Sequence, residues 1–501
     1  MDDRVTVAAR TKAGAGVLSP PTLLVLGLGF LLMIRILGLA TNATDLFFDE
    51  AQYWSWSREL AFGYYSKPPL IAGIIGIATA ACGDSTACIR LPAPLLHTAT
   101  AVVVYLIGKR LHGARVGLWS ALAFATLPGV SLSSGIISTD VPLLACWAVA
   151  LWALIAIEDS DSGWAPAILL GLALGLGLNA KYAMVFFLAC LAVYLVVTPG
   201  ARRLLGDPRL WVGLGLGGLL IAPNLVWNVS NSFATFAHTA DNARLGGSLL
   251  NIGKGLEFVA AQFGVFGPIL FAGLIVTAAR AWREGLSEAD RFLLCFTLPV
   301  LLLISAQAFL SRAHANWAAV AYVAGAILVT STLMRLEAKR WLQGSLALHA
   351  AVAIAFVVAT TFAGRFTLPV VGDPFQRTLG WRALADDAGR VLDAARRAGQ
   401  PYKAVMADDR SVTAELLYYL RHDPTPVVAW RDSGRPRDHY EMTRAFRDPT
   451  RVPILLISIR RDATAITSRF ATVDTIADRS VPAGLGEPRR FRLLSLSDYR
   501  R

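Results

Sequence analysis

Eleven apolar runs dominate this sequence, most of them about as long as a helix needs to be to cross a lipid bilayer. At a rise of 1.5 Å per residue, a hydrocarbon core of about 30 Å takes about 20 residues. The runs lie near residues 22–41, 90–108, 115–133, 142–157, 164–180, 182–198, 210–228, 258–279, 291–310, 317–334 and 342–362. The chain is 55% hydrophobic and only 16% charged, which excludes an ordinary soluble enzyme. We therefore predict a polytopic α-helical membrane protein with about 11 to 13 transmembrane helices.

The charged residues are unevenly distributed along the chain. It has 47 Lys and Arg and 35 Asp and Glu, and half of these, 24 basic and 17 acidic, lie in residues 363–501. This predicts a cytoplasmic tail 1–21, a transmembrane domain 22–362 and an extracytoplasmic α/β domain 363–501. In the last region, helical periodicity over 381–398 and short apolar strands such as 453–459 favour a layered sheet. The net charge of +12 does not indicate nucleic-acid binding, because no basic–aromatic stripe is present.

The short basic loops set the predicted orientation. A twelfth apolar stretch, 68–82, is only 15 residues long and opens with two prolines, so we expect it to lie at the interface or to re-enter the membrane. Every basic short loop then falls on the cytoplasmic side, together with the N-terminus. The outer side receives the C-terminal region and the segments 42–67, 134–141, 229–257 and 311–316.

The first outer loop, 42–67, carries most of the candidate chemistry. Asp49 and Glu50 lie where a short helix is expected to begin, and the helix dipole stabilises acidic residues there. Tyr53 and Trp56 share one face of that helix, which favours an interfacial position. On this segment alone, the two acids are either a helix cap or a catalytic pair.

Four further charged residues lie near the outer membrane edge. Asp140 is flanked by apolar runs, where a carboxylate is costly unless it is paired, hydrated or used, or caps the next helix. Lys67 directly precedes two prolines, whose stiffness suits a lysine that binds a phosphate at the headgroup level or one that snorkels. Arg35, in the outer half of the first run, and Lys181 are additional candidates for binding a phosphate.

Several aromatic and polar residues share the same outer side and are candidates for lining a substrate cavity. A single histidine in a loop is usually only solvated. These residues are candidates because all of them are expected on the same, outer side of the membrane. The candidates are Tyr53, Tyr64, Tyr182, His238, His314 and Asn316.

The cysteines do not indicate a metal site. None of them forms a CxxC motif or a Cys/His cluster with metal-ligand spacing, and we predict that they are mainly small core residues. A disulfide between Cys82 and Cys88 is the alternative if that loop faces an oxidising compartment. Gly171, Gly175 and Gly177 lie inside an apolar run, where they indicate close helix packing and not a nucleotide site.

Three motifs together resemble those of a known enzyme family. They are the acidic motif 49–53 (Asp-Glu-Ala-Gln-Tyr), the motif 66–70 (Ser-Lys-Pro-Pro-Leu) and the motif 139–143 (Thr-Asp-Val-Pro-Leu). The chain resembles membrane glycosyltransferases of the GT-C fold, over about residues 23–363. Within that fold it is similar to the protein O-mannosyltransferase superfamily, which includes lipid A aminoarabinose transferases and rhizobial lipopolysaccharide galacturonosyltransferases.

The resemblance implies a role for each motif residue. Asp49 matches the preferred catalytic acid or base, Glu50 its acidic neighbour, and Asp140 the second-loop aspartate that works with Asp49. Lys67 matches the lysine that holds the phosphate of the lipid carrier. Two positions depart from the aminoarabinose transferases, which typically have arginine at the position of Gln52 and a carboxylate at the position of Ser66.

The resemblance further implies the partners and the location of the protein. The donor is a sugar on a polyprenyl phosphate, and the acceptor is a lipid, a glycan such as lipid A or lipopolysaccharide, or a protein. Transfer takes place on the outer, periplasmic face of a bacterial inner membrane, with inversion at the anomeric carbon. No cofactor is predicted, and the sequence offers no clear ligand set for a divalent metal. The alternative is a transporter or flippase of lipid-linked sugars, but we find no internal repeat of the kind that transporters usually show.

Overall fold

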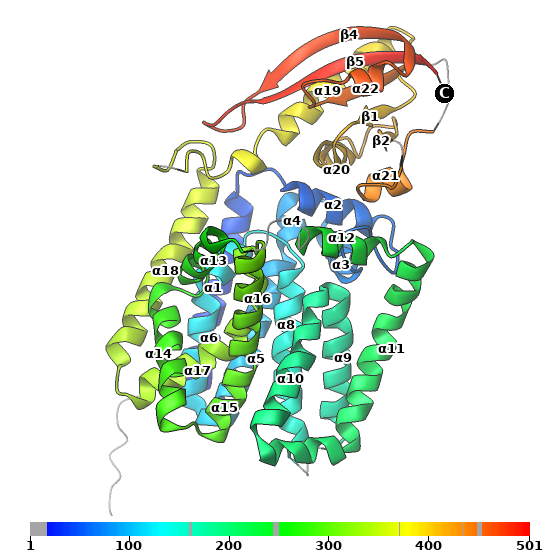
Figure 1. Ribbon diagram of the computed structural model, residues 1–501. Coiled ribbons are helices and arrows are strands. Elements are labelled where there is room, and N and C mark those ends of the chain that lie inside the picture. Colours follow the sequence, from blue (N-terminus) through cyan, green and yellow to red (C-terminus); the bar gives the residue numbers. More distant parts are fainter. Residues whose placement is uncertain are drawn as a thin grey trace, which may run out of the picture.

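The structure, a computed structural model, is a bundle of long helices with a smaller mixed domain docked on one end (Figure 1). It describes residues 18–159, 163–243, 250–369, 371–432, 434–447 and 453–500. The helices of 13 residues or more are α1 (Pro20–Thr41), α3 (Leu70–Cys82), α5 (Pro92–His112), α6 (Ala114–Thr126), α8 (Asp140–Ile157), α9 (Ala165–Ala180), α10 (Val185–Val197), α11 (Pro208–Ser230), α13 (Ile252–Val265), α14 (Pro268–Glu284), α16 (Leu298–Leu310), α17 (Ala321–Arg335) and α18 (Lys339–Thr361). Shorter helices between them are α2 (Phe48–Ser57), α4 (Thr86–Arg90), α7 (Pro128–Ser133), α12 (Ala234–Ala243) and α15 (Glu288–Cys295), with 3-10 turns η2 (Tyr182–Met184), η3 (Pro199–Gly206) and η4 (Ala315–Ala318).

The helices are those of a multi-pass membrane protein. Among the described residues, six helical segments are long and apolar enough to cross a membrane, or seven if the bent pair α13–α14 counts as one span. The six are Pro20–Thr41, Thr86–His112, Asp140–Ile157, Pro208–Ser230, Glu288–Leu310 and Lys339–Thr361. The predicted runs 164–180, 182–198 and 317–334 correspond to shorter apolar helices. The stretch 68–82 forms the short helix α3, which packs against α2 near the end of the bundle that carries the smaller domain.

Two of the predicted spans show how a proline divides an apolar run. Residues 258–279 were expected to form one span, but α13 and α14 meet at 113°. Gly267, with φ of 88°, takes a conformation that suits glycine, and Pro268 then begins α14 without an N–H to donate. Residues 115–133 are likewise divided into α6 and α7, because Pro128 begins the second helix.

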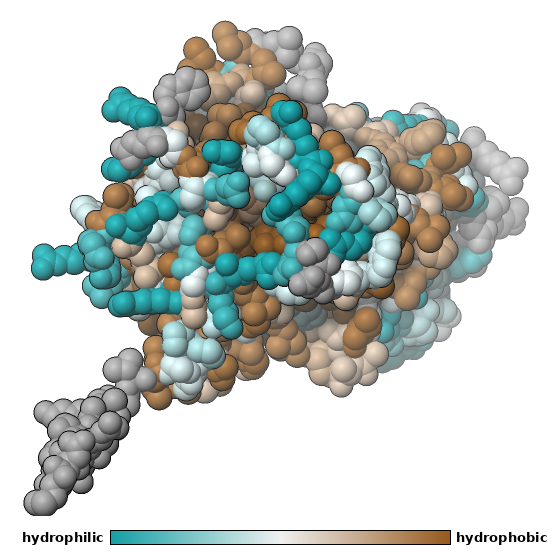
Figure 2. Space-filling model, turned by 90° about the horizontal axis from the view of Figure 1, so that it is seen from below, coloured by the Kyte–Doolittle hydropathy of each residue, from teal (hydrophilic) through white to brown (hydrophobic). Residues whose placement is uncertain are grey.

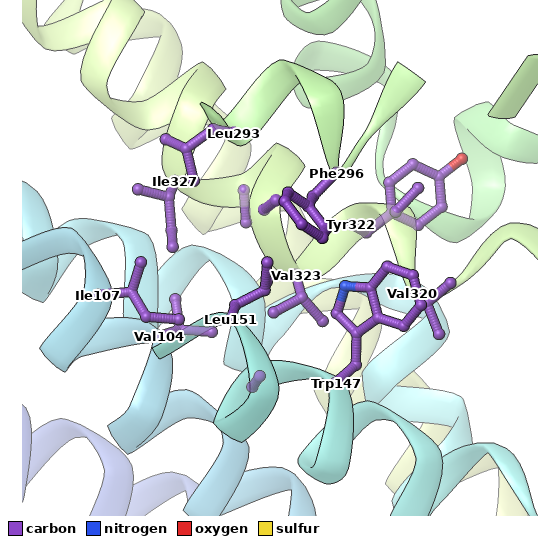
Figure 3. Close-up of a cluster of buried hydrophobic side chains, with 14 of the residues drawn as sticks. Val104, Ile107, Trp147, Leu151, Leu293, Phe296, Val320, Tyr322, Val323 and Ile327 are labelled. Carbon is purple, nitrogen blue, oxygen red and sulfur yellow. The ribbon is translucent and has the colours of Figure 1, made fainter. Parts of the chain in front are cut away.

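The core of the bundle surrounds α17, whose residues from Ala321 to Thr332 are all buried. Figure 3 shows Tyr322 and Val323 of this helix among side chains from α5, α8 and α15, including Trp147, and beside Phe296, which follows the last residue of α15. Glycine allows α9 and α11 to pack closely together. A Cβ on Gly175 of α9 would lie only 2.5 Å from the Cβ of Leu220 in α11. The packing interpretation of the glycines in α9 is therefore confirmed.

The end of the bundle opposite the smaller domain is rich in charge. Hydrophilic side chains gather on this face (Figure 2), which carries ion pairs such as Arg110–Asp159 at 3.1 Å and Arg335–Asp290 at 2.7 Å. This is the face that the positive-inside rule assigns to the cytoplasm. The assignment itself stays a prediction.

The C-terminal region is a five-stranded sheet with helices. Its strands are β1 (Val405–Ala407), β2 (Val427–Ala429), β3 (Ile454–Ser458), β4 (Phe470–Val481) and β5 (Arg489–Tyr499), and its helices are η5 (Gln376–Thr378), α19 (Trp381–Arg397), α20 (Arg410–Tyr419), α21 (His439–Thr443) and α22 (Thr464–Thr467). The order is β2-β1-β3-β5-β4, with β1 parallel to β2 and β3, and with β5 antiparallel to β3 and β4. The small α/β domain expected from the sequence is therefore present, and we call it the tail domain.

The tail domain is packed tightly on α2. One cluster of buried apolar side chains is shared by both parts and includes Trp54, Trp56, Tyr418 and Tyr440. The rings of Trp54 and Tyr418 meet edge to face with 5.1 Å between their centroids, and the hydroxyls of Ser55 and Tyr440 lie 2.9 Å apart. This packing fixes α20 and α21 of the tail domain relative to the first outer loop.

Candidate active site

Glu50 is buried, and both of its carboxylate oxygens accept hydrogen bonds. It is the third residue of α2 and accepts a hydrogen bond from the backbone N–H of Phe47, so it caps its own helix. Its other contacts are the guanidinium of Arg90, with Nη2 to Oε2 at 2.8 Å, and the backbone N–H of Ile137 at 2.9 Å. Glu50 has no exposed surface, and both of its oxygens are occupied. The cap expected of it is confirmed, and the catalytic role stays a prediction.

Asp49 is bound by an arginine of the tail domain. It lies in the first turn of α2, and Nη1 of Arg410 donates to its Oδ1 at 2.8 Å. The same Nη1 donates to Oε1 of Gln52, one turn further along the helix. Unlike Glu50, Asp49 keeps about a third of its side-chain surface exposed, at 37%. It is therefore the acid of the pair that a substrate can reach.

Asp140 begins α8 and is held from two sides. Lys181, which follows the last residue of α9, places its Nζ 2.7 Å from Oδ1, and Asn316 donates from Nδ2 to Oδ2 at 2.7 Å. Asp140 and Asn316 together line a cavity of about 400 Å³ between α7, α8 and η4. A carboxylate at the membrane edge is thus paired, as its cost of desolvation requires.

Lys67 lies beside a second cavity and has no ion-pair partner within 4.0 Å among the described residues. The cavity has a volume of about 290 Å³ and is lined by Lys67, Lys181, Tyr182, His238 and Trp317, among others. We call it the lysine cavity. Burial first, and then the charge of Lys181, lower the pKa of Lys67, while Asp49 and Asp140 oppose this shift. A bound anion would stabilise the charge of this ammonium.

His238 and Tyr182 form part of the wall of the lysine cavity. The ring of Tyr182 is stacked on Phe236 with 4.8 Å between centroids, and its hydroxyl donates to Asn224 at 2.7 Å. His238 lies 2.9 Å, through Nε2, from the amide of Asn242. Burial, together with the charges of Lys67 and Arg410, lowers the pKa of His238 to about 4. This imidazole is therefore neutral near pH 7.

The electrostatic environment shows that the separate parts of the site lie close together. The charges of Asp49, Asp140 and Arg410 all act on Lys67, and the same three charges act on the hydroxyl of Tyr53. Burial first, and then Asp49, raise the pKa of Tyr53 well above its ordinary value. Residues from α2, α8 and α20 thus converge at the end of the bundle beneath the tail domain.

Three predicted residues lie elsewhere. Arg35 lines a separate cavity of about 70 Å³ and donates to the backbone oxygen of Ala125, so it is not placed beside Lys67. Tyr64 stacks on Trp56 and donates to its backbone oxygen at 3.0 Å, which braces the loop instead of lining a cavity. His314 packs against Trp317 with 5.3 Å between ring centroids and does not itself line the lysine cavity.

Sequence reasoning missed Arg410 and Arg90. Arg90 was counted as the first residue of an apolar run, although a charged residue at that position needs a partner. Arg410 follows strand β1 after two aspartates, and the carboxyl ends of parallel strands are where functional side chains commonly lie. That position is the signal that would have marked Arg410 as a candidate.

Cys82 and Cys88 are joined by a disulfide, with their Cα atoms 5.9 Å apart. The expectation of free core cysteines is therefore wrong for this pair, and the alternative is correct. Among the described residues, no group of three or more His, Cys, Asp or Glu side chains lies close enough together to hold a metal ion.

Comparison with known proteins identifies the bundle with its tail domain as a membrane glycosyltransferase of the GT-C class. Residues 66–227 match the family described as dolichyl-phosphate-mannose-protein mannosyltransferase. ArnT from Cupriavidus metallidurans, solved with undecaprenyl phosphate bound, matches with a TM-score of 0.66 at 16% identity, over 95% of this chain and 98% of that one.

Two curated relatives narrow the family. The chain is 37% identical over 430 residues to the lipid A galacturonosyltransferase RgtD of Rhizobium johnstonii. The matched region covers 86% of this chain and 89% of that protein. It is 28% identical over 193 residues, 38% of this chain and 34% of the relative, to the undecaprenyl phosphate-alpha-4-amino-4-deoxy-L-arabinose arabinosyl transferase of Pseudomonas aeruginosa. The chain belongs to the family of membrane glycosyltransferases that includes RgtD.

Proposed function

We propose that this protein transfers a galacturonosyl residue from a polyprenyl-phosphate donor to lipid A or lipopolysaccharide. The family supports the chemistry in outline, because one relative is named for galacturonosyl transfer to lipid A and another for a donor on undecaprenyl phosphate. Within the structure, one observation carries the proposal. Lys67 presents a half-buried ammonium, without an ion-pair partner among the described residues, to a cavity between membrane helices. A lipid-linked phosphate is the anion that suits this position.

The reaction is a single displacement at the anomeric carbon. An acceptor hydroxyl attacks this carbon, and the bond from the carbon to the phosphate oxygen breaks, with its electron pair leaving on the phosphate. The acceptor proton passes to the Asp49 carboxylate. Because negative charge grows on the phosphate as the bond breaks, Lys67 stabilises the transition state more than the ground state. One displacement inverts the anomeric configuration.

The remaining residues position these groups. Arg410 and the helix dipole of α2 hold Asp49 in place. Lys181 and Asn316 fix the carboxylate of Asp140, whose free lone pairs then face the space where the sugar ring is expected. The neutral imidazole of His238 offers the donor a hydrogen bond and adds no charge.

The membrane orientation is part of the proposal. The disulfide between Cys82 and Cys88 lies on the face that carries the tail domain. Disulfides persist in oxidising compartments such as the periplasm, so this bond supports a periplasmic tail domain and a cytoplasmic basic face. We therefore place the protein in a bacterial inner membrane, with transfer taking place on its periplasmic side.

Two substitutions test the catalytic roles in purified protein in lipid nanodiscs. Asp49→Asn keeps the volume and the ability to accept a hydrogen bond from Arg410, but it cannot take up a proton, so we expect transfer to fall by at least about 100-fold. Glu59→Gln is the matched control, because Glu59 is an exposed acid of the same loop that pairs with Arg444. Lys67→Ala is expected to weaken donor binding, and Lys254→Ala, which removes an exposed lysine, is its control.

The readout is mass spectrometry of the acceptor together with donor binding. Turnover at the wild-type rate by Asp49→Asn would refute its role as the base. Unchanged donor affinity in Lys67→Ala would refute the phosphate site. Movement of the intact lipid-linked sugar across the bilayer without its transfer would favour a flippase.

A further inference from the structure

We infer that Arg410 of the tail domain binds the carboxylate of the transferred uronic acid and thereby selects the donor sugar. This inference rests on the proposed function, because only a uronic acid brings a second anion to the site. It assigns to the tail domain a direct role in specificity. Arg410 is held in place, it has donors left for a ligand, and it contacts Asp49, the proposed base.

Arg410 is held in a defined position before any substrate binds. It is the first residue of α20, whose N-terminus is capped by Asp409 through a 2.7 Å hydrogen bond from the backbone N–H of Ser411. The guanidinium carbon lies 4.9 Å from the centroid of the Phe48 ring, a cation–π contact with the first residue of α2. The aromatic contacts between α20 and α2 hold this arrangement. Arg410 therefore loses little side-chain entropy when it binds a ligand.

The guanidinium has donors left for a ligand. Its Nη1 serves both Asp49 and Gln52. Among the described residues, neither Nε nor Nη2 has a protein acceptor, and neither is a buried atom without a partner, so both remain accessible. Nε and Nη2 form the side edge of the guanidinium, which binds a carboxylate through two parallel hydrogen bonds.

Arg410 lies next to the group that is proposed to react with the sugar. A galacturonosyl phosphate linked to a polyprenol carries two anions, the phosphodiester and the carboxylate. Lys67 takes the phosphate, and Lys181 is already bound to Asp140 at 2.7 Å. Arg410 contacts Asp49, the proposed base, at 2.8 Å, so a sugar that reacts there comes within reach of its remaining donors.

The test compares two donors that differ only in the group at C6. Polyprenyl-phosphate galacturonate and polyprenyl-phosphate galactose are each given to the full-length protein, and kcat/KM is measured for both. We expect the wild type to prefer the galacturonosyl donor by about 100-fold or more, because a buried site made for a hydrogen-bonded group rejects the analogue without it. Arg410→Gln is expected to reduce this preference by about 10- to 100-fold.

Two further variants separate recognition from positioning. Arg410→Lys keeps the charge but loses the two-pronged geometry, so it should recover only part of the preference. Arg444→Gln is the matched control, since it removes an ion pair with Glu59 at the same domain interface, and it should keep the wild-type preference.

Each outcome is decisive. Equal loss of activity toward both donors in Arg410→Gln would overturn the inference, because a residue that only orients Asp49 acts on both sugars alike. A changed preference for phosphorylated over dephosphorylated lipid A, with an unchanged donor preference, would overturn it in favour of an acceptor contact. A wild-type protein that transfers neither sugar would instead refute the proposed function.

Discussion

Replacing Arg90 by methionine distinguishes a structural from a catalytic role for Glu50. Arg90 is 1% exposed and donates to Glu50 from Nε at 3.0 Å and from Nη2 at 2.8 Å. It also donates to Thr44 Oγ1 at 3.0 Å and to the backbone oxygen of Asp45 at 2.8 Å. Methionine fills a similar volume but offers no donor. The substitution therefore leaves the Glu50 carboxylate buried, with only two backbone N–H groups to bind it.

The size of the effect follows from this burial. Removing one partner of a buried ion pair costs about 3 to 5 kcal/mol. At about 2.1 cal/mol/K per residue, a chain of 501 residues has an unfolding entropy of about 1 kcal/mol/K. The melting temperature should then fall by about 3 to 5 °C. In the double variant Arg90→Met with Glu50→Gln both charges are gone, and the loss should be smaller than the sum of the single losses by about 2 kcal/mol.

The assay measures the melting temperature in detergent, with size-exclusion chromatography to monitor the folded fraction. Transfer activity is then measured per folded molecule. We expect Glu50→Gln and Arg90→Met to have lower melting temperatures than the wild type. We expect the double variant to retain a kcat within a few-fold of the wild-type value. If Glu50→Gln instead melts like the wild type and has lost its turnover, Glu50 is a catalytic residue and the structural argument is wrong.

Two other properties follow from the site and from the loop beside it. Donor affinity should fall as the pH rises through the lowered pKa of Lys67, because only the protonated ammonium binds phosphate. Lys67→Arg should remove this dependence, and an affinity of the wild type that stays constant between about pH 7 and pH 10 would contradict it. Reduction of the Cys82–Cys88 disulfide, which spans a sequence separation of 6, should cost about 2 kcal/mol. A variant with serine at both positions should melt about 2 °C lower and no longer respond to reductant.

The sequence predicted the elements whose burial is local and continuous. The runs 22–41 and 142–157 correspond within two residues to α1 and α8, and the short apolar strand 453–459 contains β3. The hairpin of β4 and β5 was missed. Most of β4 is exposed and carries charged residues, so it lacks the apolar run that marks a buried strand. The sharp bend before Pro268 was also missed, because apolar composition alone does not reveal a helix break.

Local sequence patterns could not predict which residues of the site form ion pairs with each other. Asp49 and Arg410 are 361 positions apart, and nothing near either residue indicates the other. Sidedness predicted correctly that Asp140 and Lys181 share one face, but it could not show that they form an ion pair. Glu50 illustrates the limit of motif reasoning. Its place beside Asp49 suggested shared chemistry, whereas helix geometry turns adjacent side chains by about 100° and sends this one into the protein.

Asp49 and Asp140, the two acids of the proposed site, are bound by cations from different elements, and one of these cations belongs to the tail domain. Asp140 is neutralised within the bundle by Lys181, but Asp49 has Arg410 of the tail domain as its counter-ion. The same docking buries the indole of Trp56, which packs against His439 with 5.3 Å between ring centroids. A chain without the tail domain would expose this aromatic face of α2 and leave Asp49 without its arginine. The same contacts between α2 and the tail domain therefore stabilise the first outer loop and hold Arg410 beside Asp49. A substitution at this interface should lower both the stability of the protein and its activity.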